Sequence, residues 1–243
     1  MVITSINNEK IKNLCKLHMK KYRDEEEKFL IEGDHLVKEA IKSNNLLELI
    51  LLEDNKLDIS FDNITYVTKE VMDKLSEQDS STNVIGICKY INNNDNLNNK
   101  LILLDGLQDP GNVGTIIRSA VAFNYDVILG DNTVDIYNSK TIRSTEGMIF
   151  NVNFIKSNLV DFIKNNNNYN YYIADMNKGK ELKDIDKDNK VAVIVGNEGN
   201  GVSSGIRNLN LNYLHIKQNS KCESLNVGVA SSIIMYEIGD ANE

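Results

Sequence analysis

Short apolar runs alternate with helix-length segments throughout the second half of this chain. The run VAVIV at 191–195 is apolar at every position, and a strand that is apolar on both faces suits a parallel sheet with helices on each side. The alternation therefore predicts an α/β fold with a mostly parallel sheet. The expected strands lie at 101–104, 127–129, 171–174, 191–195 and 213–216, and the expected helices lie near 113–123, 139–146, 159–165 and 224–236.

The first half of the chain shows a shorter alternation of the same kind, which predicts a small α/β domain. Its expected helices lie near 11–17, near 35–41 and from Thr68 onward, and its expected strands lie at 29–33, 47–52 and 84–91. The polar, asparagine-rich segment at 93–99 is typical of a linker. The sequence thus predicts two domains, at 1–92 and 100–243.

The formal net charge of the chain is −8. This argues against indiscriminate adhesion to nucleic acid, because long-range attraction to phosphate grows with positive charge. One segment differs: between Glu9 and Arg23 there are six basic residues, including Lys10 and Lys12, and one acid. Such a segment could steer RNA to one face of the protein. On charge alone a solvated amphipathic helix is the favoured interpretation, because most charge runs are solvated faces.

Cys15, Cys88 and Cys222 are odd in number and form no CxxC pair, so we expect free thiols in a reducing compartment. The N-terminus lacks the basic-then-apolar layout of a signal peptide, and no apolar run approaches the roughly 18 residues of a membrane helix. The three histidines have no metal-ligand spacing. We therefore expect a cytoplasmic protein with no metal and no membrane partner.

Ligands of open α/β sheets bind beyond the carboxyl ends of the strands, and three segments at such ends have an unusual composition. The first segment is DGLQDPGNVGTIIR at 105–118. It contains three glycines and the only proline of the chain, which is typical of a tight turn that enters a helix. It holds two polar candidates, Asn112 and Arg118. Residues six apart in one helix do not share a face, so these two converge only if Asn112 lies in the loop. For this segment alone, a capped helix with a surface arginine is the favoured interpretation.

The second segment is GNEGNGVS at 196–203, after the most apolar strand. Three glycines in six positions imply positive φ angles and close approach of a bulky group, and they leave Glu198 exposed. The pattern is neither GxGxxG nor a P-loop, which disfavours a Rossmann oxidoreductase. A plain turn is the alternative.

The third segment is the loop at 217–222 with the start of the last helix, ESLNVGVASS at 223–232. Ser224 and Asn226 are polar at a helix start, where capping alone would explain them. The small residues that follow them allow the helix to pack closely against a neighbour.

These three segments, each uninformative alone, resemble a known family when they are taken in this order. Asn-x5-Arg from Asn112, Gly-Asn-Glu-Gly-x-Gly from Gly196 and Glu-Ser-Leu-Asn-Val-x-Val-Ala from Glu223 resemble the three motifs of the SpoU/TrmH family, RNA methyltransferases of the SPOUT superfamily. The resemblance runs from 101 to 237 and includes IRSTEG at 142–147. Before the linker, SINNEKIK at 5–12 and FLIEG at 29–33 resemble the L30e-like substrate-binding domain that often precedes it.

The resemblance implies an enzyme that transfers a methyl group from S-adenosylmethionine to a ribose 2'-hydroxyl of structured RNA, with 23S rRNA favoured over tRNA. It also implies a trefoil knot in the catalytic domain and a homodimer with the active site near the subunit interface. No metal is implied. Two alternatives stay open: a tRNA 2'-O-methyltransferase, and a non-catalytic RNA-binding or assembly factor.

The resemblance also implies roles for individual residues. Arg118 would grip the flanking phosphate and stabilise the developing alkoxide, since a guanidinium is too basic to act as the base. Asn112 would orient the ribose, and Glu198 would place the attacking oxygen. The expected catalytic residues are Arg118, Asn112, Glu198, Ser224 and Asn226; the expected cofactor residues are Gly196, Ile216, Leu225, Asn226 and Glu198; the expected RNA-binding residues are Lys10, Lys12, Arg23 and Arg118.

One segment departs from the family pattern. Relatives usually carry a proline and one or more glycines after the position of Ile216, whereas this chain has KQNSK at 217–221. We therefore expect a cofactor loop that is less pre-shaped. This departure is the best support for the non-catalytic alternative.

Overall fold

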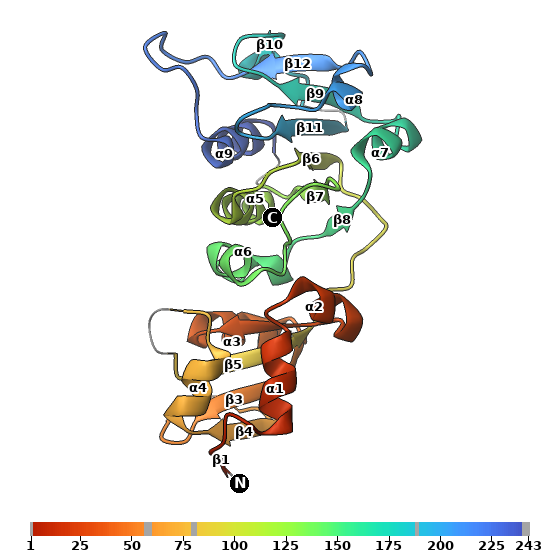
Figure 1. Cartoon of the computed structure of the whole chain (residues 1–243). Helices are drawn as coiled ribbons and strands as arrows, with labels where there is room; N and C mark the ends of the chain where they lie inside the picture. Colours follow the sequence, from red (N-terminus) through yellow and green to blue (C-terminus); the bar gives the residue numbers. More distant parts are fainter. Residues whose placement is uncertain (1, 56–59, 79–81, 188–189, 240–243) are drawn as a thin grey trace. The chain divides into compact units, whose positions relative to one another are not determined.

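The structure is a computed structural model that describes residues 2–55, 60–78, 82–187 and 190–239. It divides into two compact units, the first formed by Met1–Asn92 with Asp135–Phe150 and the second by Asn93–Val134 with Asn151–Glu243. Each unit is built around a sheet of its own (Figure 1). The α/β fold that the sequence predicts is confirmed.

Unit 1 contains a mixed five-stranded sheet in the order β1-β4-β3-β5-β2. The first three of these strands are parallel, whereas β5 runs antiparallel to both of its neighbours. The strands are β1 (Val2–Ile3), β2 (Lys28–Glu32), β3 (Leu46–Leu52), β4 (Ile64–Val67) and β5 (Val84–Lys89). The helices are α1 (Glu9–Lys16), α2 (Lys20–Glu26), α3 (Asp34–Lys42), α4 (Lys69–Leu75) and α6 (Ser139–Ser144), with a 3-10 turn, η1 (Met148–Phe150).

The apolar faces of α1 and α4 pack together with the strands of unit 1. The core that they form contains the buried residues Ile11, Ile50, Val67, Val71, Met72, Leu75, Ile85 and Ile87. Ile11 is the buried residue of α1, and Val71, Met72 and Leu75 are the buried residues of α4. Burial of such a face supplies most of the stability of short helices.

The segment 135–150, which lies within the predicted second domain at 100–243, packs into unit 1. Tyr137 stacks on Tyr90 with ring centroids 4.0 Å apart, and its ring centroid lies 4.7 Å from that of Phe29. The Tyr137 hydroxyl accepts a hydrogen bond from the backbone N–H of Ile91. Aromatic packing therefore fixes this segment, and aromatic pairs at such spacings stabilise beyond their buried area.

Unit 2 contains a seven-stranded sheet that is parallel throughout, in the order β10-β12-β9-β11-β6-β7-β8. Its strands are β6 (Lys100–Asp105), β7 (Asp126–Leu129), β8 (Phe154–Lys156), β9 (Asn170–Ala174), β10 (Lys180–Glu181), β11 (Val191–Gly196) and β12 (Asn212–His215). Its helices are α5 (Pro110–Ala122), α7 (Leu159–Asn165), α8 (Ser204–Arg207) and α9 (Val227–Ile238), with a 3-10 turn, η2 (Leu182–Asp184). Figure 1 shows α5 and α9 on one face of the sheet and α7 and α8 on the other. The expected parallel sheet with helices on both faces is confirmed.

Two helix boundaries differ from the prediction in ways that matter for the site. α5 begins at Pro110, because proline presets the backbone for a first helical turn, and Asn112 therefore lies inside the helix. α9 begins at Val227, because Asn226 is its N-cap. The sequence also misses β8 and β10, which are three and two residues long. Strands this short leave no readable apolar pattern.

The predicted linker at 93–99 is tied to unit 2 close to its end. Asn98 donates hydrogen bonds from its backbone N–H and from Nδ2 to the carboxylate of Asp126, and Asn153 Nδ2 donates to the same carboxylate. Asp126 is only 3% exposed, and burial raises its pKa above the ordinary value of 3.8. Three donors to one buried carboxylate thus fix the point at which the chain enters β6.

Candidate functional site

A cavity of about 580 Å³ lies at the carboxyl ends of β9, β11 and β12, beside the start of α9. Ligands usually bind at this edge of a parallel sheet, and small-molecule sites have volumes of this order. The apolar lining includes Ile173, Val195, Leu214, Ile216, Leu225 and Ile234. The polar lining includes Asp175, Asn197, Glu198, Arg207, Gln218, Ser224 and Asn226.

The glycine-rich loop after β11 shapes one wall of the cavity. Asn197 and Gly201 exchange two backbone hydrogen bonds, of 3.1 and 2.8 Å, so the loop closes tightly. A Cβ on Gly196 would lie 2.2 Å from the carbonyl carbon of Gly201, and Gly201 has a φ of +66°. The loop therefore requires glycine at both positions.

A hydrogen-bond chain joins the three motif segments at 105–118, 196–203 and 223–232. Asn226 Nδ2 donates to Asn112 Oδ1 at 2.9 Å, and Asn112 Nδ2 donates to Glu198 Oε1 at 2.8 Å. These residues come from the start of α9, the first turn of α5 and the loop after β11. Although Asn112 and Asn226 are 114 residues apart in the sequence, the topology of the parallel sheet brings them into contact.

The N-cap of α9 determines how this chain of amides is oriented. Asn226 Oδ1 accepts hydrogen bonds from the backbone N–H groups of Gly228 and Val229. Because this oxygen is engaged at the helix end, Nδ2 must face Asn112, which then presents its own Nδ2 to Glu198. Among the described residues, Oε2 of Glu198 receives no hydrogen bond. That oxygen is therefore free to accept one from a ligand hydroxyl.

Arg118 lies apart from these residues. Its side chain is exposed on α5 and lines a second hollow, of about 560 Å³, together with Thr115, Ser119 and Tyr236. Because Asn112 is inside α5, the two positions six residues apart lie on different faces of the helix. Of the predicted catalytic residues, three line the cavity (Glu198, Ser224 and Asn226) and Arg118 lines this hollow. Asn112 is joined to the cavity residues by its hydrogen bonds to Asn226 and Glu198.

The second hollow belongs to the face formed by α5 and α9, which pack closely against each other. A Cβ on Gly228 would lie 3.3 Å from the Thr115 side chain, and the hydroxyls of Ser119 and Ser232 are 2.7 Å apart. The large apolar side chains of α9 that remain exposed are Val229, Ile233 and Tyr236. Exposed apolar patches mark interaction surfaces.

All the predicted cofactor residues line the cavity, and Ser224 lines it too. The sequence does not predict several other polar or flexible lining residues, among them Asp175, Met176, Arg207 and Gln218. Asp175 has a usable signal, since it directly follows the predicted strand at 171–174 and so stands at a carboxyl end. Arg207 has none, because the four-residue α8 leaves no periodic pattern.

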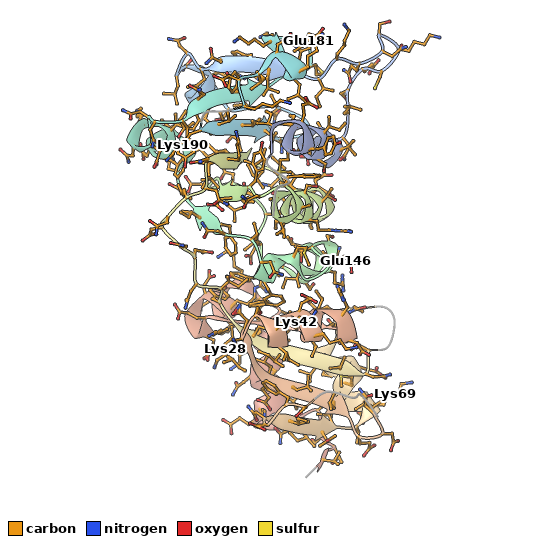
Figure 2. All side chains as sticks on the ribbon, turned by 180° about the vertical axis from the view of Figure 1, so that it is seen from behind. Lys28, Lys42, Lys69, Glu146, Glu181 and Lys190 are labelled. Atoms are coloured by element: carbon orange, nitrogen blue, oxygen red, sulfur yellow. The ribbon has the colours of Figure 1, made fainter. Side chains whose placement is uncertain are left out.

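Side chains, rather than proline or glycine, shape the loop after β12. The Asn219 side chain accepts a hydrogen bond from the backbone N–H of Lys221, and its carbonyl accepts one from Cys222. Lys217 Nζ lies 3.2 Å from Oε1 of Glu181, which is labelled in Figure 2. An asparagine turn and an ion pair thus hold the segment that departs from the family pattern.

In unit 1, Arg23 is a structural residue. It is 4% exposed, its Nη1 donates to the carbonyls of Leu17 and His18, and its Nη2 lies 2.6 Å from a carboxylate oxygen of Asp135. In this structure the guanidinium is buried and already paired, so it would have to break these contacts to meet an RNA phosphate. RNA binding by Arg23 stays a prediction, and the contacts do not favour it.

The other two basic candidates of unit 1, Lys10 and Lys12, are exposed residues of α1. Lys10 Nζ binds the carboxylate of Glu48 and the hydroxyl of Thr65. Lys12 has no ion pair within the described part of the chain. Of the two, Lys12 can therefore meet a phosphate without breaking an existing contact.

The remaining expectations concern thiols, metals and membranes. The three cysteines are free. Within the described ranges, no three His, Cys, Asp or Glu side chains gather where a metal ion could be held. No helix of these residues is long and apolar enough to cross a membrane.

Both halves of the chain match known protein families. Residues 99–236 match the SpoU rRNA Methylase family, and residues 8–86 match the MRM3-like substrate binding domain. The 23S rRNA (guanosine(2553)-2'-O)-methyltransferase RlmP of Bacillus subtilis is 34% identical, over 97% of this chain and 98% of that protein. The sequence similarity thus extends over both units.

Solved structures resemble the chain over nearly its whole length. The AdoMet-bound rRNA methyltransferase of Sinorhizobium meliloti matches with a TM-score of 0.84 and 25% identity, covering 98% of this chain and 97% of that one. AviRb of Streptomyces viridochromogenes, a SpoU methyltransferase in complex with AdoMet, has the same fold at a TM-score of 0.84 and 20% identity, covering 96% and 97%. The chain therefore belongs to the SpoU rRNA methylase family and carries an N-terminal MRM3-like substrate-binding domain.

Proposed function

We propose that this chain is an S-adenosylmethionine-dependent RNA 2'-O-ribose methyltransferase. The observation that carries the proposal is the hydrogen-bond chain Asn226–Asn112–Glu198, which ends on a carboxylate at the cavity. A carboxylate held in this way can orient a hydroxyl toward a ligand in the cavity. The relatives named as RNA 2'-O-methyltransferases match nearly the full length of the chain, which supports the same assignment.

The residues of the cavity fit S-adenosylmethionine. Ile216 and Leu225 offer the apolar surface that an adenine ring requires, and Gly196 lines the same cavity beside them. Structures of two relatives contain AdoMet. We therefore assign the adenosine part of the cofactor to these three residues, with Ser224 offering a hydroxyl beside them.

The residues of the chain position the nucleophile. When bound, the cofactor supplies an electron-poor methyl group attached to sulfur. Glu198 accepts a hydrogen bond from the ribose 2'-hydroxyl and can take up its proton, while Asn112 holds Glu198 and Asn226 holds Asn112. Displacement requires alignment of oxygen, methyl carbon and sulfur, so this positioning supplies much of the rate.

We further propose that the protein is a homodimer in which Arg118 serves the partner's site. Arg118 lies outside its own cavity, on the α5–α9 face with the exposed residues Val229, Ile233 and Tyr236. Two-fold pairing of this face would bury those side chains and bring Arg118 to the interface. There it can grip an RNA phosphate with two parallel N–H donors. Arg118→Lys keeps the charge but not the paired donors, so near wild-type methylation by this variant would contradict the role.

The proposed substrate is 23S rRNA, at the nucleotide that corresponds to guanosine 2553. The Bacillus subtilis relative named for that nucleotide matches both units of the chain, and unit 1 matches a substrate-binding domain. The proposed location is the cytoplasm, where thiols like the three free cysteines stay reduced.

Mapping of 2'-O-methyl groups in total RNA, with and without the gene, tests the proposed target. We expect one 23S rRNA site to lose its methyl group. Loss of a tRNA site would support the tRNA alternative, and an unchanged map would contradict the enzymatic role. Calorimetry with S-adenosylhomocysteine tests the non-catalytic alternative, because an assembly factor with a degenerate cavity would not bind it.

A further inference from the structure

Arg207, the last residue of α8, is the one cation among the described residues that line the cavity. Its Nε donates a hydrogen bond to the backbone carbonyl of Val202 at 2.7 Å. A Cβ on Gly201 would lie 2.8 Å from its Nη2, so the guanidinium rests against the glycine-rich loop. These contacts hold the guanidinium in place at the wall of the cavity.

The guanidinium of Arg207 has unused hydrogen-bond donors. An arginine side chain carries five N–H donors, and the bond to Val202 uses the one on Nε. Within the described part of the chain, Nη1 and Nη2 have no acceptor and no carboxylate partner. A fixed guanidinium with free paired donors matches a planar carboxylate, which can accept both of its hydrogen bonds.

The acidic residues that line the same cavity are Asp175 and Glu198, and other contacts already orient both. Asp175 Oδ1 accepts hydrogen bonds from the backbone N–H groups of Asn177 and Lys178, and Glu198 belongs to the chain described above. The cavity therefore combines one free cation with two fixed carboxylates. This pattern of charge suits a ligand that carries both an acidic and an ammonium group.

We propose that Arg207 binds the α-carboxylate in the methionine part of the cofactor. This inference rests on the proposed function, because S-adenosylmethionine brings an α-carboxylate and an α-ammonium group into the cavity. An RNA phosphate is the other anion that could approach. The carboxylate is favoured because Arg207 lines the same cavity as Ile216 and Leu225, whereas Arg118 lines the separate hollow on the α5–α9 face.

Calorimetry with two ligands tests the inference without turnover. S-adenosylhomocysteine contains the amino-acid part, whereas 5'-methylthioadenosine lacks it and reports on the adenosine part of the cavity alone. We expect Arg207→Met to weaken S-adenosylhomocysteine binding about tenfold, the size of a lost hydrogen bond to a charged group, and to leave methylthioadenosine binding unchanged. Lys178→Met is the matched control, because Lys178 lies over the Tyr213 ring, 5.6 Å from its centroid, and not in the cavity lining.

Three results would overturn the inference. Unchanged S-adenosylhomocysteine affinity in Arg207→Met would show that the carboxylate is bound elsewhere, even if RNA binding became weaker. Equal losses for both ligands would show a general effect on the cavity. If the wild-type protein bound neither ligand, the proposed function itself would fail, and this inference with it.

Discussion

Asn112 Nδ2 lies 2.8 Å from Glu198 Oε1, although the two residues are 86 positions apart in the sequence. The first is held in α5 and the second in the loop after β11. Both follow the carboxyl ends of neighbouring parallel strands, β6 and β11. The contact brings the first and second sequence segments together.

Glu198→Gln tests whether the carboxylate at the end of the chain is needed. Glutamine keeps the size of the side chain but removes the proton-accepting oxygen. We expect the rate of RNA methylation to fall by about 100-fold, as is common when a positioned proton acceptor is lost, while S-adenosylhomocysteine affinity is retained. Glu237→Gln, which removes a carboxylate of α9 that pairs with Lys187, is the control and should stay active. A Glu198→Gln enzyme with wild-type rate would refute the role.

Two substitutions separate the two roles of Asn226. Asn226→Ala removes the cap of α9, so we expect the free energy of unfolding in urea to fall by about 1 kcal/mol and methylation to be lost. Asn226→Asp keeps a side-chain oxygen that can cap α9, and the N-terminus of a helix favours a negative charge. The aspartate cannot, however, donate a hydrogen bond to Asn112. We expect this variant to be as stable as wild type and as inactive as Asn226→Ala.

A matched control for this pair is Asn8→Asp, because Asn8 caps α1 through the backbone N–H of Lys10 and lies in unit 1. It should change neither stability nor methylation. An Asn226→Asp enzyme that methylates RNA at the wild-type rate would show that the hydrogen bond to Asn112 is not required.

The sequence predicts the parallel sheet and the loops of the site because both leave local signals. The apolar run at 191–195 requires burial on both faces, and Gly196 and Gly201 mark a loop that no other residue fits. The hydrogen-bond chain leaves no such signal, because it depends on which strands are neighbours. Strand order is a property of the whole sheet and cannot be read from any one segment.

Of the local features of the sequence, charge says least about where a side chain lies in the folded protein. Arg23 and Lys12 belong to the same basic run, yet Arg23 is buried against Asp135 whereas Lys12 is exposed. A run of charges does not reveal which member meets a carboxylate more than a hundred residues away. The sequence does not predict that 135–150 packs into unit 1, for the same reason. Tyr137 contacts Phe29 and Tyr90, which are distant from it in the sequence.

Mixed dimers test whether Arg118 acts across the interface. Arg118→Ala has an intact cavity, and Asn226→Asp has an intact Arg118. The two inactive variants are mixed in equal amounts and allowed to exchange subunits. If each site uses Arg118 of the other copy, half of the dimers are mixed and each mixed dimer has one complete site. We therefore expect about a quarter of the wild-type methylation to return. No recovery, in dimers shown by native mass spectrometry to have exchanged, would mean that Arg118 serves its own subunit.

Arg23→Met tests the structural role of the buried arginine. The substitution removes the Arg23 donors from Oδ2 of Asp135 and from the carbonyls of Leu17 and His18. We expect the free energy of unfolding to fall by roughly 3 kcal/mol, the cost of breaking a buried ion pair from one side. Lys21→Met, at a lysine whose side chain is 74% exposed, should change it by less than about 0.5 kcal/mol. Equal effects of the two substitutions on urea unfolding would contradict the structural role.

The raised pKa of Asp126 predicts how the free energy of unfolding depends on pH. Burial raises its pKa above 3.8 in the folded protein, so the folded state holds this proton more tightly than the unfolded state does. The contribution of Asp126 to stability is therefore fully present below pH 3.8 and is lost as the pH rises through the raised folded pKa. Since Asp126→Asn cannot titrate, the free energy of unfolding of wild type minus that of the variant should fall over this range and then level off. Urea unfolding at stepped pH measures this difference, and a difference that stays flat or grows with pH would show that the three donors from Asn98 and Asn153 outweigh the cost of burial.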